Sequence, residues 1–168
     1  DPYVDRSGLE KDNPFGHVIM NLPEQLPSFG MRHLAHEMGH AMFNLADEYV
    51  GQQLGFDGRP DLSTWPSCAE DRAEAEAWWG DLVGEVDPMV DVWMDEMDDA
   101  GFSMGADARE FFAEQVRVGF VEGGCYGVPG SIRATEDSLM NNSIPVMGLV
   151  NRRWAESILD LWEPRPRA

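Results

Sequence analysis

The stretch with the clearest capacity for chemistry, residues 36–49, reads HEMGHAMFNLADEY. If this stretch is an α-helix, His36 and His40 project from one face, because a spacing of four residues is close to one turn. Two imidazoles at that spacing can bind one Zn²⁺ ion through a ring nitrogen each. Glu37 follows the first histidine and can reach a water bound to the metal, whose proton it would accept. The pattern predicts a zinc site with a catalytic base beside it.

The alternative is an amphipathic helix that happens to carry two half-buried histidines. Three of the four histidines fall within residues 33–40, and a glutamate occupies the position that the chemistry requires. Both facts favour the metal site over the alternative. His33 lies one turn before Glu37 and is expected to be structural. His17 is expected to be an ordinary surface or core histidine.

A third ligand is needed, because catalytic zinc takes three protein ligands and keeps one position open. Asp47 follows His40 by seven residues, so in an unbroken helix it would lie about 10 Å further along the axis, out of reach. The helix must therefore end and the chain turn back. Asn44 suits that turn, because asparagine tolerates the left-handed conformation found at helix C-termini. The returning chain then presents Asp47 or Glu48 to the metal; a solvated acidic loop is the alternative.

The rest of the sequence predicts a single α+β domain over residues 1–168, without internal repeats. Hydrophobic periodicity and turn residues indicate where its elements lie. In chain order we expect a strand over 17–21, a helix over 28–45, a loop over 46–68, helices over 69–86, 89–100 and 108–115, a strand-like segment over 116–123, a glycine-rich loop over 123–131 and a helix over 150–162.

Acidic residues dominate the chain: 31 Asp and Glu stand against 12 Lys and Arg, for a formal net charge of −19. A nucleic-acid partner is not expected, because its phosphates would be repelled over most of the surface. Asp91, Asp95, Asp98 and Asp99 do not follow the spacing of a calcium-binding loop and are expected to be solvent-exposed. No apolar run is long enough to predict a membrane span.

Two cysteines, Cys68 and Cys125, lie outside any C-x-x-C pair, so a thiolate zinc site is not indicated. They form either a disulfide or two buried thiols. Both lie in loop-like contexts, TWPSCAED and EGGCYG, where a link between distant segments is useful, and this favours the disulfide. A disulfide and an acidic surface favour an extracellular or periplasmic location. The polar opening DPYVDRSGLEKDNPFG shows no leader and no initial methionine, which suggests a processed or truncated chain.

The motif, a turn, a third ligand and a distal methionine together resemble the metzincin clan of zinc endopeptidases. The string HEMGHAMFNLADEY more specifically resembles the IgA-peptidase-like family of bacterial metallopeptidases, as do EGGCYG, SIRATEDSLMNN and PVMGLVNRRW. The resemblance covers residues 33–50 and 119–155. It implies a metzincin-like catalytic fold, a zinc cofactor and a protein or peptide substrate. It also implies that Met140 lies in a tight turn beneath the metal; an ordinary core methionine is the alternative.

The sequence departs from the metzincin consensus at the third ligand. Phe43 stands at the consensus glycine, Ala46 at the consensus ligand, and Asp47 one residue beyond, so Glu48 remains the alternative ligand. Metzincin domains also carry a sheet before the active-site helix, of which only HVIMN is visible, so an N-terminal part is expected to be missing. The phenol of Tyr126 is a candidate to stabilise the oxyanion of peptide hydrolysis, with aromatic packing as its alternative.

The leading hypothesis is a zinc-dependent endopeptidase in which His36, His40 and Asp47 bind the metal and Glu37 is the base. One alternative is a gluzincin-type peptidase whose third ligand is a glutamate on a later helix. It predicts a helix that continues past Asn44 and no special place for Met140. The candidate ligands for it are Glu74, Glu76, Glu110 and Glu114. A second alternative is a zinc-stabilised or metal-free binding domain without turnover.

Overall fold

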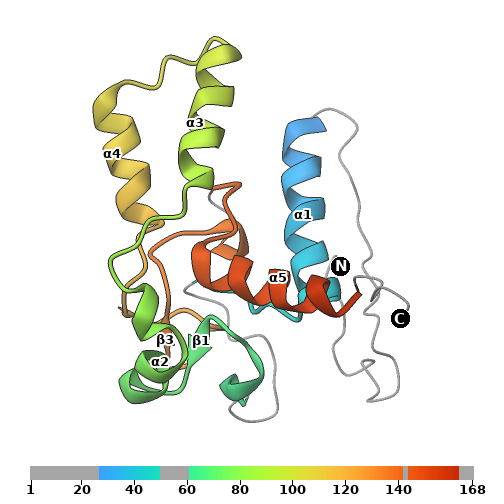
Figure 1. Ribbon diagram of the computed structural model, residues 1–168, viewed down its shortest axis with the longest axis vertical. Helices are drawn as coiled ribbons and strands as arrows, with labels where there is room; N and C mark the ends of the chain where they lie inside the picture. The colour runs from blue at the N-terminus through green and yellow to red at the C-terminus, as the bar shows by residue number, and fades with distance from the viewer. Residues whose placement is uncertain (1–26, 50–60, 142–143, 163–168) are drawn as a thin grey trace, which may run out of the picture.

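The computed structural model describes residues 27–49, 61–141 and 144–162 of the chain. These parts combine helices with a small antiparallel sheet, so the expected α+β class is confirmed (Figure 1). The expected strand over 17–21 and His17 lie outside the described residues, as do residues 50–60 of the expected loop over 46–68.

The elements follow the order of the chain. The helices are α1 (Pro27–Phe43), α2 (Arg72–Trp79), α3 (Met89–Asp99), α4 (Ala106–Gln115) and α5 (Leu149–Trp162), the strands are β1 (Cys68–Ala69), β2 (Val121–Glu122) and β3 (Ile132–Arg133), and the short 3-10 turns are η2 (Leu62–Thr64), η3 (Gly80–Leu82) and η4 (Leu139–Asn141). The predicted helices at 89–100, 108–115 and 150–162 are thus confirmed, with ends shifted by a few residues.

Two sequence-based boundaries were wrong. The helix expected over 69–86 begins only at Arg72, because Asp71 caps it by accepting a hydrogen bond from the Glu74 N–H. It then ends at Trp79 and gives way to η3. The strand-like segment over 116–123 contributes only the two residues of β2 to the sheet, together with an isolated bridge between Val86 and Arg117.

The sheet is small and antiparallel, in the order β1-β3-β2. Its central strand, β3, pairs Arg133 with Cys68 on one side and with Val121 on the other. Trp79 of α2 packs in the buried cluster beside this sheet and donates its indole N–H to the Gly119 carbonyl at 2.9 Å. Strands this short provide few hydrogen bonds, so the packing of α2 carries much of the stability here.

A disulfide joins Cys68 of β1 to Cys125 in the glycine-rich loop, as predicted. Both sulfur-bearing side chains are fully buried in one cluster with Trp65 and Tyr126. The bridge closes a sequence separation of 57 residues. It thereby fixes the glycine-rich loop against the start of the sheet.

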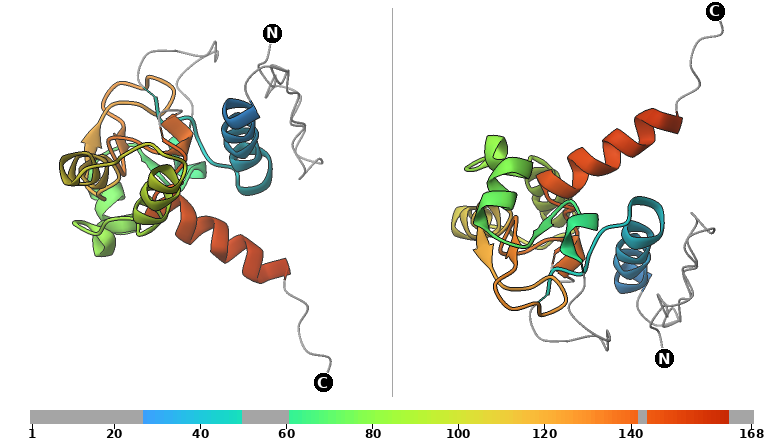
Figure 2. Two further views of the ribbon diagram at one scale, coloured as in Figure 1. Left: turned by 90° about the horizontal axis from the view of Figure 1, so that it is seen from above. Right: turned by 90° about the horizontal axis from the view of Figure 1, so that it is seen from below.

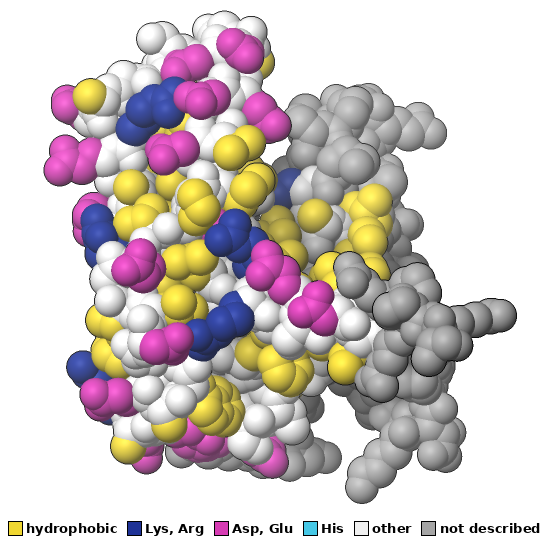
Figure 3. Space-filling model, in the orientation of Figure 1, with side chains coloured by type: hydrophobic (Ala, Val, Ile, Leu, Met, Phe, Trp, Pro, Cys, Tyr) yellow, Lys and Arg dark blue, Asp and Glu magenta, His cyan; other side chains and the backbone are white. Residues whose placement is uncertain are grey.

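Helices α3 and α4 lie side by side and project together from the body (Figure 1). They share a core that includes Val90, Met94 and Val116. Arg109 on α4 pairs with Asp95 and Asp98 of α3, at 2.7 and 2.6 Å. The four aspartates of α3 named above are exposed, as expected. Figure 3 shows acidic side chains gathered over this part of the visible face, with hydrophobic ones below them.

Helix α5 crosses the middle of the molecule, where it contacts the C-terminal end of α1, and then extends away from the body (Figure 2). Phe43, Leu45, Met140 and Ala155 form the buried cluster between these elements. Trp154 on α5 adds a hydrogen bond from its indole N–H to the Phe43 carbonyl at 2.8 Å. Among the described residues, no helix is long and apolar enough to cross a membrane.

Candidate metal centre

Helix α1 ends at Phe43, two residues before the end of the expected helix, and the chain turns at Asn44 as predicted. Asn44 adopts φ 52°, in the left-handed region, and its N–H donates to the His40 carbonyl at 3.0 Å. Its side-chain amide donates to the Thr64 carbonyl at 3.0 Å, which holds the turn against the segment that follows. The chain reverses here, so residues 45–48 return along the helix instead of continuing it.

This reversal brings Asp47 to the two histidines. Asp47 Oδ1 lies 3.1 Å from His36 Nε2 and 3.0 Å from His40 Nε2, and the two Nε2 atoms are 3.1 Å apart. Together the three side chains offer ligand atoms close enough to hold one metal ion. His36 and Asp47 are buried, and His40 is partly buried. The convergence of Asp47 on the histidines, which a solvated acidic loop would not show, is confirmed.

The other nitrogen of each imidazole is fixed by a backbone carbonyl. His36 Nδ1 donates to the Leu139 carbonyl at 2.9 Å, and His40 Nδ1 donates to the Leu45 carbonyl at 2.6 Å. Because a carbonyl oxygen can only accept, each Nδ1 carries the ring hydrogen, and in the neutral imidazole Nε2 presents a lone pair. Such outer contacts fix both the ring orientation and the tautomer of metal-binding histidines.

The donor set fits a cation. With both rings neutral, the two Nε2 lone pairs face Asp47 Oδ1, a buried oxygen that has no hydrogen-bond donor among the described residues. Three acceptors at this separation repel one another unless a positive charge lies between them. A metal ion or a proton supplies that charge. Nitrogen and carboxylate ligands in this number suit zinc.

The same charges act on the pKa values. Burial lowers the pKa of His36, but hydrogen bonds to Asp47 and to the Leu139 carbonyl, with nearby carboxylate charge, outweigh burial and raise it. Burial raises the pKa of Asp47, but the two imidazoles outweigh burial and hold that pKa well below its usual range. The site is therefore electrostatically arranged to attract a cation.

Glu37, the candidate base, lies on the same helix between the two histidines in sequence. Its carboxylate is about one-seventh exposed, with a side-chain accessibility of 14%. Its Oε1 is 3.5 Å from Nε2 of His33, one turn earlier. His33 is not among the clustered ligand atoms. The position of His33 outside the cluster agrees with its expected structural role. The charge of Glu37 acts on the adjacent His36.

Glu48, the alternative ligand, turns away from the histidines. Its carboxylate is buried and accepts hydrogen bonds from the Ser138 hydroxyl at 2.6 Å and from the Asn151 amide at 2.8 Å. Its backbone N–H donates to the Met140 carbonyl at 3.0 Å. Burial raises the pKa of Glu48 despite these hydrogen bonds. Glu48 thus ties the returning chain to η4 and α5, and Asp47 alone faces the imidazoles.

Met140 lies beneath α1 in the turn η4. It is fully buried, and η4 contacts α1 directly. A Cβ atom on Gly39 would lie only 2.8 Å from Met140 Sδ, so the glycine permits the turn to approach the helix between the two histidines. The neighbouring carbonyl of Leu139 is the one that fixes His36. Met140 therefore packs against α1 at Gly39, between the two histidines in sequence.

Tyr126 contacts the centre through its backbone. Its N–H donates to the Asp47 carbonyl at 3.3 Å, while its ring is buried against Trp65 with ring centroids 4.9 Å apart. Cys125 and Tyr126 both have positive φ, 49° and 63°, in a tight turn. At Gly124 a Cβ atom would overlap the Glu48 carbonyl oxygen, so only glycine fits there. The glycine-rich loop therefore packs directly on residues 47–48.

The gluzincin alternative made a prediction that the structure contradicts, because α1 ends at Phe43 and does not continue past Asn44. Two of its candidate ligands are bonded elsewhere. Glu74 accepts from the Glu70 N–H at 2.6 Å, and Glu114 pairs with Arg117. Within the described ranges, no glutamate joins the cluster of His36, His40 and Asp47.

Sequence reasoning missed three residues that shape the centre: Gly39, Ser138 and Asn151. Ser138 and Asn151 lie in the stretches SIRATEDSLMNN and PVMGLVNRRW, whose resemblance to a peptidase family was noted without a reason for the individual positions. Their contacts with Glu48 cross 90 and 103 residues of sequence. The available signal was that Ser138 and Asn151 are polar residues with apolar neighbours in the sequence. That signal does not identify Glu48 as their partner.

Comparison with known proteins adds no relative. No protein-family model matches the chain, and no curated protein has a matching sequence. Function is therefore inferred from the geometry of the metal centre and the chemistry of its side chains.

Proposed function

We propose that the chain is a zinc-dependent endopeptidase. The observation that carries the proposal is the convergence of His36 Nε2, His40 Nε2 and Asp47 Oδ1 on one point. Glu37 follows His36 in the chain, and its charge acts on that imidazole. Two imidazoles and one carboxylate are a common zinc ligand set, and three protein ligands leave a position for a water molecule. The carbonyls bonded to both Nδ1 atoms supply the outer contacts that such ligands need.

Bound zinc would supply a Lewis acid that polarises a peptide carbonyl and lowers the pKa of a water. Glu37 would accept a proton from the attacking water and pass it to the leaving amine. Asp47 adds a negative charge that a third histidine would not. This charge would weaken the effect of zinc on the pKa of the bound water, so the reaction would depend more on Glu37 as the base. A part for the Tyr126 hydroxyl in stabilising the oxyanion stays a prediction, which Tyr126→Phe tests by removing only that hydroxyl.

The proposal extends to family and location. The placement of Met140 and the Asp47 turn supports a relationship to the metzincin clan, and the quoted stretches support the IgA-peptidase-like family within it. The disulfide is compatible with an extracellular or periplasmic site, where such bonds persist. A protein or peptide is the proposed substrate.

The test combines metal content with turnover. Purified wild type should contain one zinc per chain and cleave unstructured polypeptides such as casein. Glu37→Gln should keep the zinc and lose about 10²–10⁴-fold in kcat, because only the base is removed. His36→Ala and His40→Ala should lose both zinc and activity.

His33→Ala is the matched control, since it removes a histidine of the same helix that lies outside the cluster and should keep the zinc. If wild type binds zinc but cleaves no polypeptide, the non-catalytic binding domain becomes the better description. If reconstituted wild type binds no zinc, the proposal fails.

A further inference from the structure

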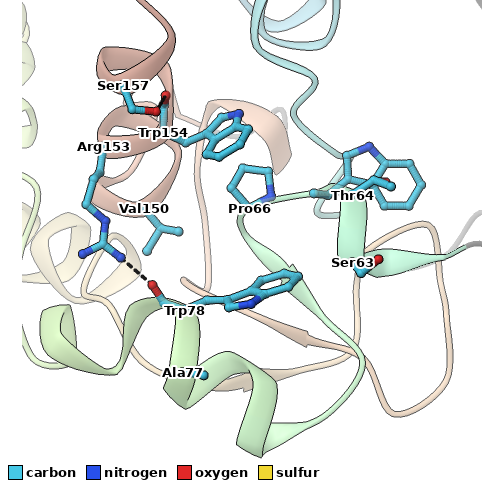
Figure 4. Close-up of a pocket in the computed structure, with 10 residues that line it drawn as sticks. Ser63, Thr64, Pro66, Ala77, Trp78, Val150, Arg153, Trp154 and Ser157 are labelled. Atoms are coloured by element: carbon cyan, nitrogen blue, oxygen red, sulfur yellow. Dashed lines mark hydrogen bonds between the residues drawn. The ribbon is translucent and has the colours of Figure 1, made fainter. Parts of the chain in front are cut away.

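A second feature, separate from the metal ligands, is a pocket of about 490 Å³ between η2, α2 and α5 (Figure 4). Its volume lies in the range of ligand-binding pockets, roughly 300–1,000 Å³. Its walls are largely apolar, formed by the indoles of Trp65, Trp78 and Trp154 with Pro66 and Val150. Three tryptophans around one pocket offer a large, rigid surface for apolar groups.

The two more accessible indoles face each other across the pocket. Trp78 comes from α2 and Trp154 from α5, and in the view of Figure 4 Pro66 lies between their two rings. Trp154 is 40% exposed, yet its ring is fixed by the hydrogen bond to the Phe43 carbonyl. The Trp78 carbonyl accepts a hydrogen bond from Arg153 at 2.6 Å. Because the walls are held before a ligand arrives, binding costs little side-chain entropy.

The charge around the pocket favours cationic ligands. The arginines on this stretch of α5 are both neutralised, Arg153 by Asp81 at 2.7 Å and Arg152 by the buried Asp87 at 3.1 Å. Exposed carboxylates lie close in sequence to the lining residues on the same elements. They are Asp61 before η2, Glu76 on α2, and Glu156 and Asp160 on α5. In a chain of net charge −19, an anionic ligand would be repelled.

The pocket adjoins the end of the metal-bearing helix. Trp154 donates to the carbonyl of Phe43, the last residue of α1, and the Thr64 carbonyl accepts from the Asn44 side chain. Trp65 packs against Tyr126, whose N–H holds the Asp47 carbonyl. The walls of the pocket and the turn that positions Asp47 are therefore in direct contact.

We propose that this pocket is a docking subsite for a polypeptide substrate, which inserts one bulky apolar side chain between Trp78 and Trp154. Basic residues next to that side chain pair with the exposed carboxylates of α2 and α5. The inference rests on the proposed peptidase function, since an endopeptidase uses contacts remote from the scissile bond to bind its substrate. It adds the substrate class: apolar side chains in a basic context.

Binding is measured by calorimetry on zinc-loaded Glu37→Gln, so that cleavage does not disturb the titration. The probe is the acetylated, amidated peptide GKGFGKG, compared with GKGAGKG and GEGFGEG. The phenylalanine peptide should bind about tenfold or more tightly than the alanine peptide, as expected for burial of one large apolar side chain. The glutamate peptide should bind more weakly than the lysine peptide.

Two variants on one helix locate the site. Ala77 lines the pocket and is exposed, so Ala77→Gln places a longer uncharged side chain at the pocket without disturbing the core. It should reduce the affinity for GKGFGKG to that for GKGAGKG. Ala73→Gln, one turn earlier on α2 and also exposed, is the matched control and should leave the affinity unchanged.

Equal binding of the phenylalanine and alanine peptides, or an effect of Ala73→Gln equal to that of Ala77→Gln, would overturn the proposal. So would N-acetylphenylalanine amide binding as tightly as the peptide, because the pocket would then be a small-molecule site. If the pocket binds the peptides as expected but wild type cleaves none, the pocket is a peptide-binding site and the peptidase proposal, with the substrate role of the pocket, fails. If wild type and Ala77→Gln cleave peptides equally well, the peptidase proposal stands and the docking proposal fails.

Discussion

Asp47 and Glu48 are adjacent in the chain, but their carboxylates bind opposite parts of the molecule. Asp47 Oδ1 lies within 3.1 Å of two imidazole nitrogens, whereas Glu48 accepts hydrogen bonds from Ser138 and Asn151. The Glu48 contacts hold the returning chain on η4 and α5, and so place Asp47 at the histidines. One carboxylate is offered to the metal and the other fixes the geometry.

This division predicts different losses for two isosteric substitutions. Asp47→Asn should lose zinc during gel filtration, because the amide is a poorer ligand than the carboxylate. Glu48→Gln should retain zinc but reduce the free energy of unfolding by roughly 1–3 kcal/mol, because a buried carboxylate that accepts two hydrogen bonds is replaced by a group with one acceptor oxygen. Metal analysis and urea unfolding measure the two effects. The reverse pattern would make Glu48 the ligand.

The end of α1 could be predicted from sequence because its causes are local. A histidine pair sets the helical face, and an asparagine that tolerates positive φ stands where the helix must end. The choice between Asp47 and Glu48 could not be made, because it is decided by Ser138 and Asn151, which are brought to Glu48 only by the fold.

The shortened α2 shows a different limit of sequence reasoning. Alanine and glutamate over 69–86 favour helix throughout, but Asp71 competes as a cap and the cysteine at 68 is drawn into strand pairing with Arg133. Cap and disulfide together fix where α2 begins. Hydrophobic periodicity alone cannot predict the start of a helix that is set by a local cap and by a disulfide between cysteines 57 residues apart.

Removal of the metal should destabilise the protein measurably. A ligand that binds only the folded state at 100 times its Kd adds about 2.7 kcal/mol, which for a chain of this length raises Tm by roughly 5–10 °C. Thermal unfolding with and without a chelator should show this shift in wild type. His36→Ala should show none, because the site is already lost. Equal shifts in both proteins would place the stabilising metal elsewhere.

Because Gly39 lies against Met140, alanine at position 39 should destabilise the protein, although alanine normally favours a helix. Alanine normally stabilises a helix by about 1 kcal/mol over glycine. Gly39→Ala should instead destabilise by about 1–3 kcal/mol, because its Cβ would lie 2.8 Å from Met140 Sδ. Gly119→Ala is the control, since nothing lies within 4 Å of its Cβ and its φ is outside the left-handed region.

The same contact is tested by a double-mutant cycle. Met140→Ala makes room for the new Cβ, so Gly39→Ala should cost less in that background, with a coupling of about 1 kcal/mol or more. Urea unfolding of the four proteins gives the coupling. Additive effects would show that the turn does not press on α1, and the placement of Met140 beneath the histidines would be wrong.

The disulfide should support both stability and the metal centre. Replacing Cys68 and Cys125 by alanine removes the constraint on a 57-residue separation, worth about 4 kcal/mol in the chain-entropy account. Because Tyr126, next to Cys125, donates to the Asp47 carbonyl, zinc affinity should fall as well. Thiol titration of denatured, non-reduced wild type should find no free thiol. His36→Ala should also show no free thiol, since the disulfide does not depend on the metal. Two free thiols in wild type would refute the disulfide and, with it, the expected effect of the double replacement on zinc affinity.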